Sequence, residues 1–405
     1  MARKMKDSGI EWIGEIPEGW EVRKGKSLYR VATGKLDANA ENPDGDYPFF
    51  TCSMAPKRIN SYSFDCEALL VAGNGLVGFT QYYKGKFDAY QRTYVLSDFR
   101  NVLPSFLRYY VSVGLPMEVQ PKSIGSVIQF IKLGDLLNFN ITLPSIEQQT
   151  IISNYLEFKI IQIDAILSKT RSSIEEYKKL KQAVITQAVT KGVRGEREMK
   201  DSGVEWIGEI PAEWKIQRFA RVAEVKSNLV SPDNYLEYPQ ISPENIEKDS
   251  GKLLLPCRTV SEVGVISGNH LFYKGQILYS KIRPKLNKVC IAPFDGLCSA
   301  DMYPIETNND TRYIMYCILS NGFLQQVSMI TENRVKMPKV NQVELSKILV
   351  AIPETIAEQK EIADYLDAKC AEIDGLIVKK EQLVKELESY KKSLIYEVVT
   401  GKREV

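Results

Sequence analysis

Five basic side chains and no acidic one stand in one short stretch, Lys274–Lys288, which reads KGQILYSKIRPKLNK. The cations of its polar half are Lys281, Arg283, Lys285 and Lys288. Lysine and arginine on a loop can neutralise phosphates, and the planar fork of arginine can also pair with a guanine edge. We predict a strand that runs into a loop stiffened by Pro284, with DNA contact as the hypothesis and a solvated charged loop as the alternative. Within that hypothesis Arg283 is the expected base reader, and the lysines are the expected phosphate ligands.

Smaller polar groups elsewhere suggest the same chemistry at lower density. They are Asn74 on the Gly-rich hairpin, Gln91 and Arg92 shortly after Lys84 and Lys86, Lys57 and Arg58 in another polar loop, and Arg334 and Lys336 just ahead of the second long helix. The amide of glutamine suits adenine and the guanidinium of arginine suits guanine, so each is a candidate DNA contact. The competing interpretation of each is an ordinary exposed polar loop.

Motifs for catalysis are missing from the sequence. The run Gly73–Gly78 fits the G-x-G-x-x-G spacing of dinucleotide sites, but Phe79–Gly85 reads as a strand or turn instead of the required helix, so we expect a tight hairpin. The chain has no G-x-x-x-x-G-K-[ST] phosphate loop, and it has no Pro-Pro pair, which an amino-methyltransferase motif needs. The single histidine, His270, is expected on a surface turn, and one histidine rules out zinc sites that need several. These absences predict a binding protein, not an enzyme.

The composition sets broad limits. With 405 residues, 44% of them hydrophobic, the chain is large enough for more than one core, and its net charge of +2 gives no overall basicity. Seven cysteines without a Cys-x-x-Cys pair favour idle thiols in a reducing compartment. No run approaches the roughly 18 apolar residues of a membrane span. We therefore expect a cytoplasmic protein without a membrane segment.

An internal repeat organises the whole sequence. Met5–Trp20 reads MKDSGIEWIGEIPEGW and Met199–Trp214 reads MKDSGVEWIGEIPAEW, so thirteen of sixteen positions agree at an offset of 194 residues (199 − 5). Leu180–Thr190 and Tyr390–Thr400 are alike at an offset of 210 (390 − 180). The middles, residues 37–120 and 230–330, cannot be aligned convincingly. Similar frames around different middles predict one scaffold that presents two different recognition surfaces.

Each middle is expected to be β-rich. Apolar or alternating runs bounded by turn residues predict strands at Leu69–Phe79, Thr93–Leu96 and Gly275–Ile282. Pro104–Val113 and Arg312–Gln326 read as short amphipathic helices.

A long helix is expected after Pro144 and another after Pro353, because a proline start with early acids suits a helix N-terminus. Apolar residues at 3-4 spacing run along both, with breaks at Thr170 and Lys380. The predicted seams are Leu156, Ile160, Ile163, Leu167, Ile174, Tyr177 and Val184, and Leu366, Ile373, Leu376, Leu383, Leu387, Tyr390 and Leu394. Such seams are typical of coiled coils, so we predict an antiparallel pair of helices. The alternative is that each helix packs only on its own domain.

The predicted fold class is therefore α+β, with two β-rich domains joined by two long antiparallel coiled-coil helices in a pseudo-two-fold duplication. The expected boundaries are residues 1–146 for the first β-rich domain and 147–198 for the central helix and linker. Residues 199–353 would form the second β-rich domain and 354–405 the C-terminal helix.

With the repeat and both helices established, the sequence resembles the specificity subunit of type I restriction-modification systems along essentially its whole length. The most specific elements are the paired S-G-[IV]-E-W-I-G-E-I-P-x-x-W segments. The P-x-x-x-E-Q helix starts come next, Pro144 with Gln148-Gln149 and Pro353 with Glu358-Gln359. Gln148 in place of the glutamate is a small departure.

The resemblance implies two target-recognition domains, each reading one half of a gapped asymmetric DNA site, with the helices as a ruler. It implies a non-catalytic chain that binds two methyltransferase subunits, which motor-nuclease subunits join. S-adenosylmethionine, ATP and Mg²⁺ would belong to those partners. The runner-up interpretation is a duplicated protein-interaction scaffold without DNA binding, and a complex that methylates without restricting stays open. Neither the target sequence nor the gap length follows from the residues.

Overall fold

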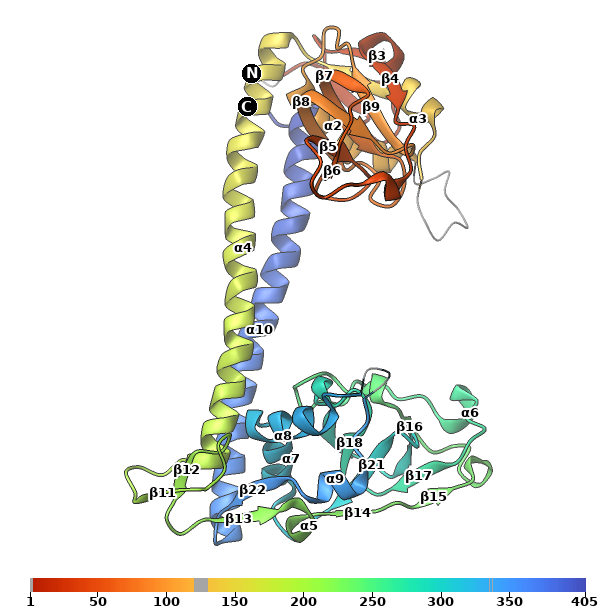
Figure 1. Ribbon diagram of the computed structural model, residues 1–405. Helices are drawn as coiled ribbons and strands as arrows, with labels where there is room; N and C mark the ends of the chain where they lie inside the picture. The colour runs from red at the N-terminus through yellow and green to blue at the C-terminus, as the bar shows by residue number, and fades with distance from the viewer. Residues whose placement is uncertain (1–2, 120–129, 335, 337) are drawn as a thin grey trace. The chain divides into compact units, whose positions relative to one another are not determined.

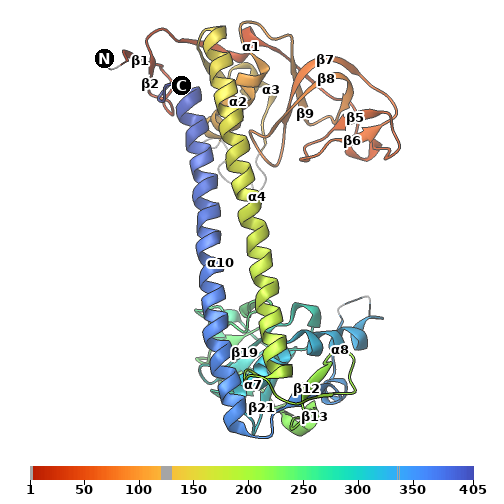
Figure 2. The same cartoon turned by 90° about the vertical axis from the view of Figure 1, so that its left-hand side faces the viewer.

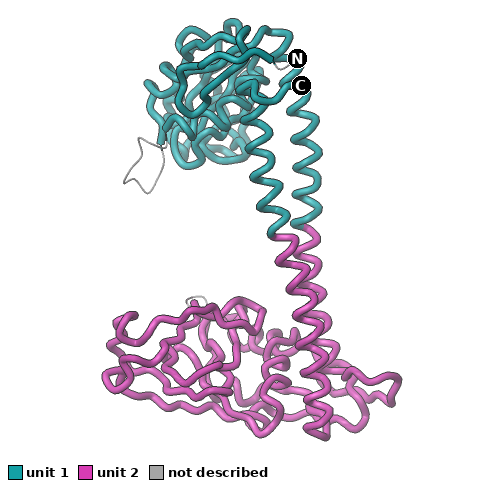
Figure 3. The backbone as a smooth tube through the Cα atoms, turned by 180° about the vertical axis from the view of Figure 1, so that it is seen from behind, with its two compact units in different colours: residues 1–171, 382–405 teal, residues 172–381 magenta. Residues whose placement is uncertain are grey.

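The computed structural model describes residues 3–119, 130–334, 336 and 338–405 (Figure 1). The chain divides into two compact units (Figure 3). Unit 1 holds residues 1–171 and 382–405, and unit 2 holds residues 172–381. Two long helices, α4 (Ile146–Lys191) and α10 (Ile356–Val399), contribute residues to both units.

Apart from its parts of the two long helices, unit 1 is built mainly of strands. Its other elements are β1 (Met5–Asp7), β2 (Glu15–Pro17), β3 (Glu21–Lys24), α1 (Gly25–Leu28), β4 (Arg30–Thr33), η1 (Ala38–Ala40), β5 (Tyr47–Phe50), β6 (Lys57–Ile59), β7 (Phe64–Ala72), β8 (Thr80–Ala89), β9 (Thr93–Ser97), α2 (Pro104–Val119), α3 (Leu133–Leu137) and β10 (Asn140–Leu143). A six-stranded sheet has the order β4-β9-β7-β8-β5-β6. Leu69 and Val71 of β7 join the core of α2 and the long helices, whereas Ala68 and Leu70 join a second cluster. Because both faces of its second half are covered, residues 68–72 of β7 form a continuous apolar run.

Unit 2 has the same kinds of element with more short strands. They are β11 (Met199–Asp201), β12 (Glu209–Pro211), β13 (Lys215–Arg218), α5 (Phe219–Val222), β14 (Glu224–Val225), β15 (Leu229–Val230), η3 (Pro232–Asn234), β16 (Gln240–Ile241), η4 (Pro243–Asn245), α6 (Val260–Val263), β17 (Asn269–Phe272), β18 (Ile277–Ser280), η5 (Pro284–Leu286), β19 (Val289–Ile291), β20 (Gly296–Cys298), β21 (Met302–Glu306), α7 (Thr311–Leu319), α8 (Asn321–Thr331), α9 (Gln342–Ser346) and β22 (Leu349–Ile352). Two four-stranded sheets have the orders β14-β21-β18-β19 and β15-β17-β20-β16.

The two units share a sheet frame that the sequences of their middles do not reveal. In chain order, β4, β7, β8 and β9 of unit 1 correspond to β14, β18, β19 and β21 of unit 2. The spatial order β4-β9-β7-β8 is then the same as β14-β21-β18-β19. The repeated ends agree as well, since β1 pairs with β2 as β11 pairs with β12, and β3 pairs with β10 as β13 pairs with β22. The duplication predicted from the sequence is confirmed.

In each unit a stretch of α4 lies beside a stretch of α10 that runs the opposite way (Figure 2). Leu156 near the start of α4 shares a core with Val398 near the end of α10. Ile185 near the end of α4 shares the other core with Leu366 near the start of α10. The antiparallel coiled coil is thus confirmed. These cores also include residues of the β-rich parts, so the helix ends pack on their domains as well.

The seam of α10 differs from the predicted one at two positions. Leu383 is 40% exposed and Tyr390 is 48% exposed, so that part of the prediction was wrong. Val384 takes the place of the first and packs on the core of unit 1. Lys391 takes the place of the second, because its long stem can lie in the seam while its ammonium binds Asp164.

Two buried or half-buried ion pairs repeat across the duplication. Lys181 Nζ lies 2.9 Å from Asp374 Oδ1 in unit 2, and Lys391 Nζ lies 2.6 Å from Asp164 Oδ1 in unit 1. Both lysines and both aspartates are related by the offset of 210 residues seen in the sequence. A polar pair at a fixed seam position favours one register over its neighbours.

Two other expectations need correction. The helix predicted over Arg312–Gln326 is two helices, α7 and α8, because the Ser320 side chain accepts a hydrogen bond from the Phe323 N–H and starts a new helix. His270 is not on a surface turn, since it lies in β17 and is only 7% exposed. β17 is an interior strand, since β15 and β20 pair with its two edges.

Candidate nucleic-acid interface

The basic stretch predicted from the sequence forms the loop between β18 and β19. Arg283 has φ 44° and Asn287 has φ 41°, so both have left-handed backbone, with the single turn η5 between them. Left-handed backbone costs free energy at residues other than glycine, and such strain gathers at functional sites. Pro284 and Asn287 are buried, whereas Arg283 and Lys285 are exposed. The loop is therefore fixed at its base and presents two cations.

The segment that carries Arg334 and Lys336 lies against this loop. The Arg283 backbone N–H donates to the Pro338 carbonyl at 2.9 Å, and the Val340 N–H donates to the Lys281 carbonyl at 2.9 Å. A β-bridge joins Ile282 to Lys339 between these bonds. Two basic groups that are far apart in the sequence thus form one surface in unit 2.

The cations of this surface differ in how far they are committed to the protein. Lys288 Nζ donates to the Pro243 carbonyl at 2.6 Å, and Lys281 Nζ lies 5.1 Å from the ring centroid of Tyr303. Arg334 is ion-paired with Glu344, and the hydrogen bond between them raises the pKa of Arg334. Within the residues that the structure describes, Arg283, Lys285 and Lys336 have no ion-pair partner, so they are the cations most available to a ligand.

Unit 1 has the equivalent loop between β7 and β8, as its place in the shared sheet shows. The Gly73 carbonyl accepts from the Ile131 N–H at 2.9 Å, and a β-bridge joins Asn74 to Phe130. Gly75 follows with φ 82°. This is the pattern of Lys281, Ile282 and Arg283 in unit 2, with glycine at the left-handed position. The hairpin expected at Gly73–Gly78 is confirmed, and the dinucleotide site is excluded because β8 follows instead of a helix.

Of the other predicted residues in unit 1, two lie beside this loop and two belong to another strand. Gln91 and Arg92 are exposed in the turn between β8 and β9, and the Arg92 carbonyl accepts from the Gly73 N–H at 2.9 Å. Lys57 and Arg58 were predicted in a polar loop, but they lie in β6 at the edge of the sheet, because residues 57–59 pair with β5. Lys57 is ion-paired with Glu41, and Arg58 Nε donates to the Gly45 carbonyl at 2.8 Å. These contacts commit both side chains to their own part of unit 1.

Sequence reasoning missed the neighbours that complete each loop. Tyr303 and Asp301 contact lysines of the unit 2 surface, and Phe130, 47% exposed, lies opposite Asn74. Residues 130–131 and 338–340, which contact the two loops, both come just ahead of a short helix, α3 or α9. This shared position is a feature of the sequence from which the contacts could have been predicted.

The exposed groups of both loops suit binding. Among residues 3–119, 130–334, 336 and 338–405, no cluster of three or more His, Cys, Asp or Glu side chains could hold a metal ion. Burial lowers the pKa of His270. No described helix is long and apolar enough to cross a membrane. What the loops offer is exposed guanidinium, ammonium and amide groups, which are the donors that phosphates and base edges accept.

Known proteins are similar to this chain in sequence and in fold. The sequence model of the family described as the type I restriction modification DNA specificity domain matches residues 17–176 and 211–386. The type I restriction enzyme EcoDI specificity subunit of Escherichia coli is 37% identical over 378 residues, which cover 90% of this chain and 84% of that protein. The putative type I restriction enzyme MjaX specificity subunit of Methanocaldococcus jannaschii is 23% identical over 430 residues, covering 96% and 95%.

One solved structure supports the same fold. It is a chain from a structure that addresses complex assembly and conformational transition of the type I R-M system. Its chain is 14% identical, covers 96% of this chain and 99% of its own length, and superposes with a TM-score of 0.68.

Proposed function

The chain belongs to the type I restriction-modification DNA specificity family, and from this premise we propose that each unit reads one half of a gapped, asymmetric DNA site. The observation that carries the proposal is the pair of equivalent loops, β7–β8 and β18–β19, on one shared sheet frame. One loop is rich in glycine and carries Asn74, while the other carries Arg283 and Lys285. Loops in equivalent places that carry different hydrogen-bonding groups are what two different half-sites require.

In unit 2 the proposed base reader is Arg283, since its planar fork suits guanine. Lys285 and Lys336 are proposed phosphate ligands, because both are exposed and lie on the same surface. Lys281, Lys288 and Arg334 are proposed to support that surface, given their contacts within the protein. In unit 1 the corresponding proposal is Asn74 with Gln91 and Arg92, and Lys57 and Arg58 are proposed to contribute charge only.

The long helices are proposed to set the spacing of the half-sites and to dock two methyltransferase subunits. Exposed apolar side chains on α4 support docking, namely Phe158 at 59%, Ile161 at 63% and Ile166 at 47% exposure. We propose that this chain itself is not catalytic. S-adenosylmethionine, ATP and Mg²⁺ would then be bound by the methyltransferase and motor-nuclease partners.

The test measures DNA binding by the complex assembled with methyltransferase subunits. Arg283→Ala should weaken binding to the cognate site by about 1–3 kcal/mol and relax one position of the second half-site only. Lys285→Ala should weaken binding to every sequence and reduce the slope of affinity against salt by about one unit. Arg221→Ala is the matched control, because Arg221 is an exposed arginine of α5 in the same unit. If Arg283→Ala behaves like this control at every salt concentration, the β18–β19 loop is not the reader.

A further inference from the structure

A buried carboxylate holds the start of α10 in unit 2. Glu358 is 3% exposed and accepts hydrogen bonds from Trp214 Nε1 at 3.2 Å and from Arg197 Nη2 at 2.7 Å. The guanidinium of Arg197 also lies 5.9 Å from the ring of Trp214. This cluster fastens the helix to the hairpin of β11 and β12 and to the segment that follows α4.

Unit 1 keeps the donors of this cluster but loses its acids. Arg3 lies 5.6 Å from the ring of Trp20, as Arg197 does from Trp214. Three glutamates pair with Arg194 or Arg197 in this cluster. They are Glu213, Glu358 and Glu361, and the equivalent residues of unit 1 are Gly19, Gln148 and Ile151. Within the described residues Arg3 has no ion pair.

The indole N–H of Trp20 lacks a hydrogen-bond acceptor in unit 1. Trp20 is 2% exposed, and its Nε1 has no hydrogen-bond partner within the part of the chain that the structure describes. A buried N–H without an acceptor destabilises the fold, so such groups are rarely left without a partner. A cavity of about 60 Å³ adjoins this tryptophan and is lined by Arg3, Gln148, Ile151, Ile152, Arg403, Glu404 and Val405. That space is enough for a small polar group.

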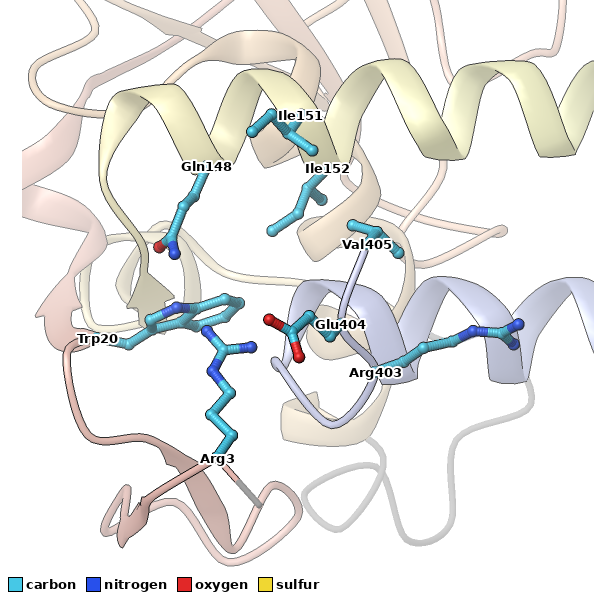
Figure 4. Close-up of a pocket in the computed structure, with 8 residues that line it drawn as sticks. All are labelled: Arg3, Trp20, Gln148, Ile151, Ile152, Arg403, Glu404 and Val405. Carbon is cyan, nitrogen blue, oxygen red and sulfur yellow. The ribbon is translucent and has the colours of Figure 1, made fainter. Parts of the chain in front are cut away.

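One acidic side chain lines the cavity, and it comes from the C-terminal segment. Figure 4 shows the carboxylate of Glu404 pointing toward the indole of Trp20 and the guanidinium of Arg3, while Arg403 points away. Gly401, where the chain leaves α10, packs on Trp20 as Gly192 packs on Trp214 after α4. The tail therefore occupies the place in unit 1 that the segment after α4 occupies in unit 2.

We propose that this cavity is a carboxylate-binding site whose occupant is Glu404. In the structure Glu404 is exposed and bonded to neither group, so it reaches this site by a turn of its side chain. There it accepts from Trp20 Nε1 and pairs with Arg3, the role that Glu358 has in unit 2. The tail, and not the helix start, supplies the acid that locks the first hairpin to the long helices. Gln148 also lines the cavity and has the size of Glu358 but not its charge, so the helix start offers no carboxylate to pair with Arg3.

The test follows the indole N–H of Trp20 in the full-length protein by NMR. The chain has four tryptophans, and Trp20→Phe identifies the resonance. Glu404→Gln should shift the Trp20 signal and speed its hydrogen exchange at least tenfold, while the Trp214 signal stays unchanged as an internal control. Gln148→Glu should restore slow exchange, and in that background Glu404→Gln should have no further effect on the Trp20 signal.

Glu397→Gln is the matched control for charge near the tail, because Glu397 pairs with Arg403 and does not line the cavity. It should leave the Trp20 signal in place. The proposal is overturned if Glu404→Gln leaves exchange at Trp20 unaltered. It is also overturned if the Trp20 N–H is protected only after methyltransferase subunits are added, to the same extent in the wild type and in the Glu404→Gln variant, because the occupant would then be a partner's acid.

Discussion

The backbone of Arg283 has a conformation that glycine adopts without cost. Its φ is 44°, and the equivalent residue of unit 1 is Gly75 with φ 82°. Arg283→Gly should therefore relieve strain and raise the free energy of unfolding by roughly 1 kcal/mol, after the extra entropy of glycine in the unfolded chain is allowed for. The same change should lower affinity for the second half-site. Thermal unfolding and DNA binding, measured on the same preparation, check the two effects together.

Arg283→Ala separates the two contributions, because alanine loses the guanidinium but keeps the strained backbone. It should bind DNA as weakly as the glycine variant without gaining stability. A glycine variant that is no more stable than the alanine variant would show that the left-handed backbone stores no strain, and the structural argument for Arg283 would fail.

The sequence alone located the basic stretch because charge density and a proline are local signals. It could not rank the cations within it. Whether Lys288 is free or bonded to the Pro243 carbonyl depends on a contact between distant residues, which spacing does not encode. The burial of His270 was missed for the same reason, since it depends on the strands that flank β17.

At the scale of elements, the long helices carry two polar pairs of unequal burial. The side chain of Asp374 is 19% exposed and bonds to both Lys181 and Lys252, whereas that of Asp164 is 50% exposed and bonds to Lys391. Burial acts to raise the pKa of Asp374, but hydrogen bonds from Lys252 and Lys181 outweigh it and lower this pKa.

Asp374→Asn should therefore cost about 1–3 kcal/mol of unfolding free energy at neutral pH. A carboxyl whose folded pKa is lowered stabilises the fold above its unfolded pKa, near 3.9 for aspartate, and loses this effect as pH falls through the folded pKa. The difference between wild type and variant should thus be full at pH 7 and vanish in strong acid. Asp164→Asn, its symmetry mate, should cost only about 0–1 kcal/mol. Equal losses in the two variants, or a loss at Asp374 that does not depend on pH, would contradict this account.

The seams were predictable because a 3-4 apolar spacing is a property of each helix by itself. Two predicted positions were wrong: Val384 takes the place of Leu383, and Lys391 takes the place of Tyr390. Lysine counts as a polar residue in a search for apolar periodicity. Its methylene stem can nevertheless pack in an apolar seam when its ammonium forms an ion pair with an acid on the facing helix.

At the scale of the whole molecule, the ruler hypothesis can be tested by a symmetric shortening of both long helices. Removing residues 169–175 from α4 and residues 380–386 from α10 deletes one heptad from each and keeps both lysine–aspartate pairs. Seven residues shorten a helix by about 10 Å, which equals about 3 base pairs of duplex DNA at 3.4 Å each. The gap in the methylated target should shrink by up to that amount, while both half-sequences stay the same.

Sequencing of methylated sites in cells that carry the shortened chain measures the gap. Removing a heptad from α4 alone is the control, because it misaligns the facing lysines and aspartates and should abolish methylation. A folded, active double deletion that retains the original gap would refute the ruler.

The duplication was visible in the sequence, but the common order of the central sheet was not. The order of strands in a sheet depends on which backbone edges form hydrogen bonds. Many different sequences are compatible with one strand order, as long as the buried faces stay apolar. The middles therefore diverged until only the topology, with loops β7–β8 and β18–β19 in equal places, retained the relation.

The division of the chain into units has a consequence for how the protein is made. Unit 2 is one continuous segment, 172–381, whereas unit 1 needs residues 382–405 to complete a core that includes Leu394, Val398 and Trp20. On the ribosome, domains usually fold in the order of their synthesis. Here unit 1 emerges first but cannot complete its core until unit 2 has been translated and has folded. Its apolar surface is exposed for most of synthesis, so a nascent chain that stops early presents a ready target for chaperones and proteases, and only a chain translated through its last helix hides it.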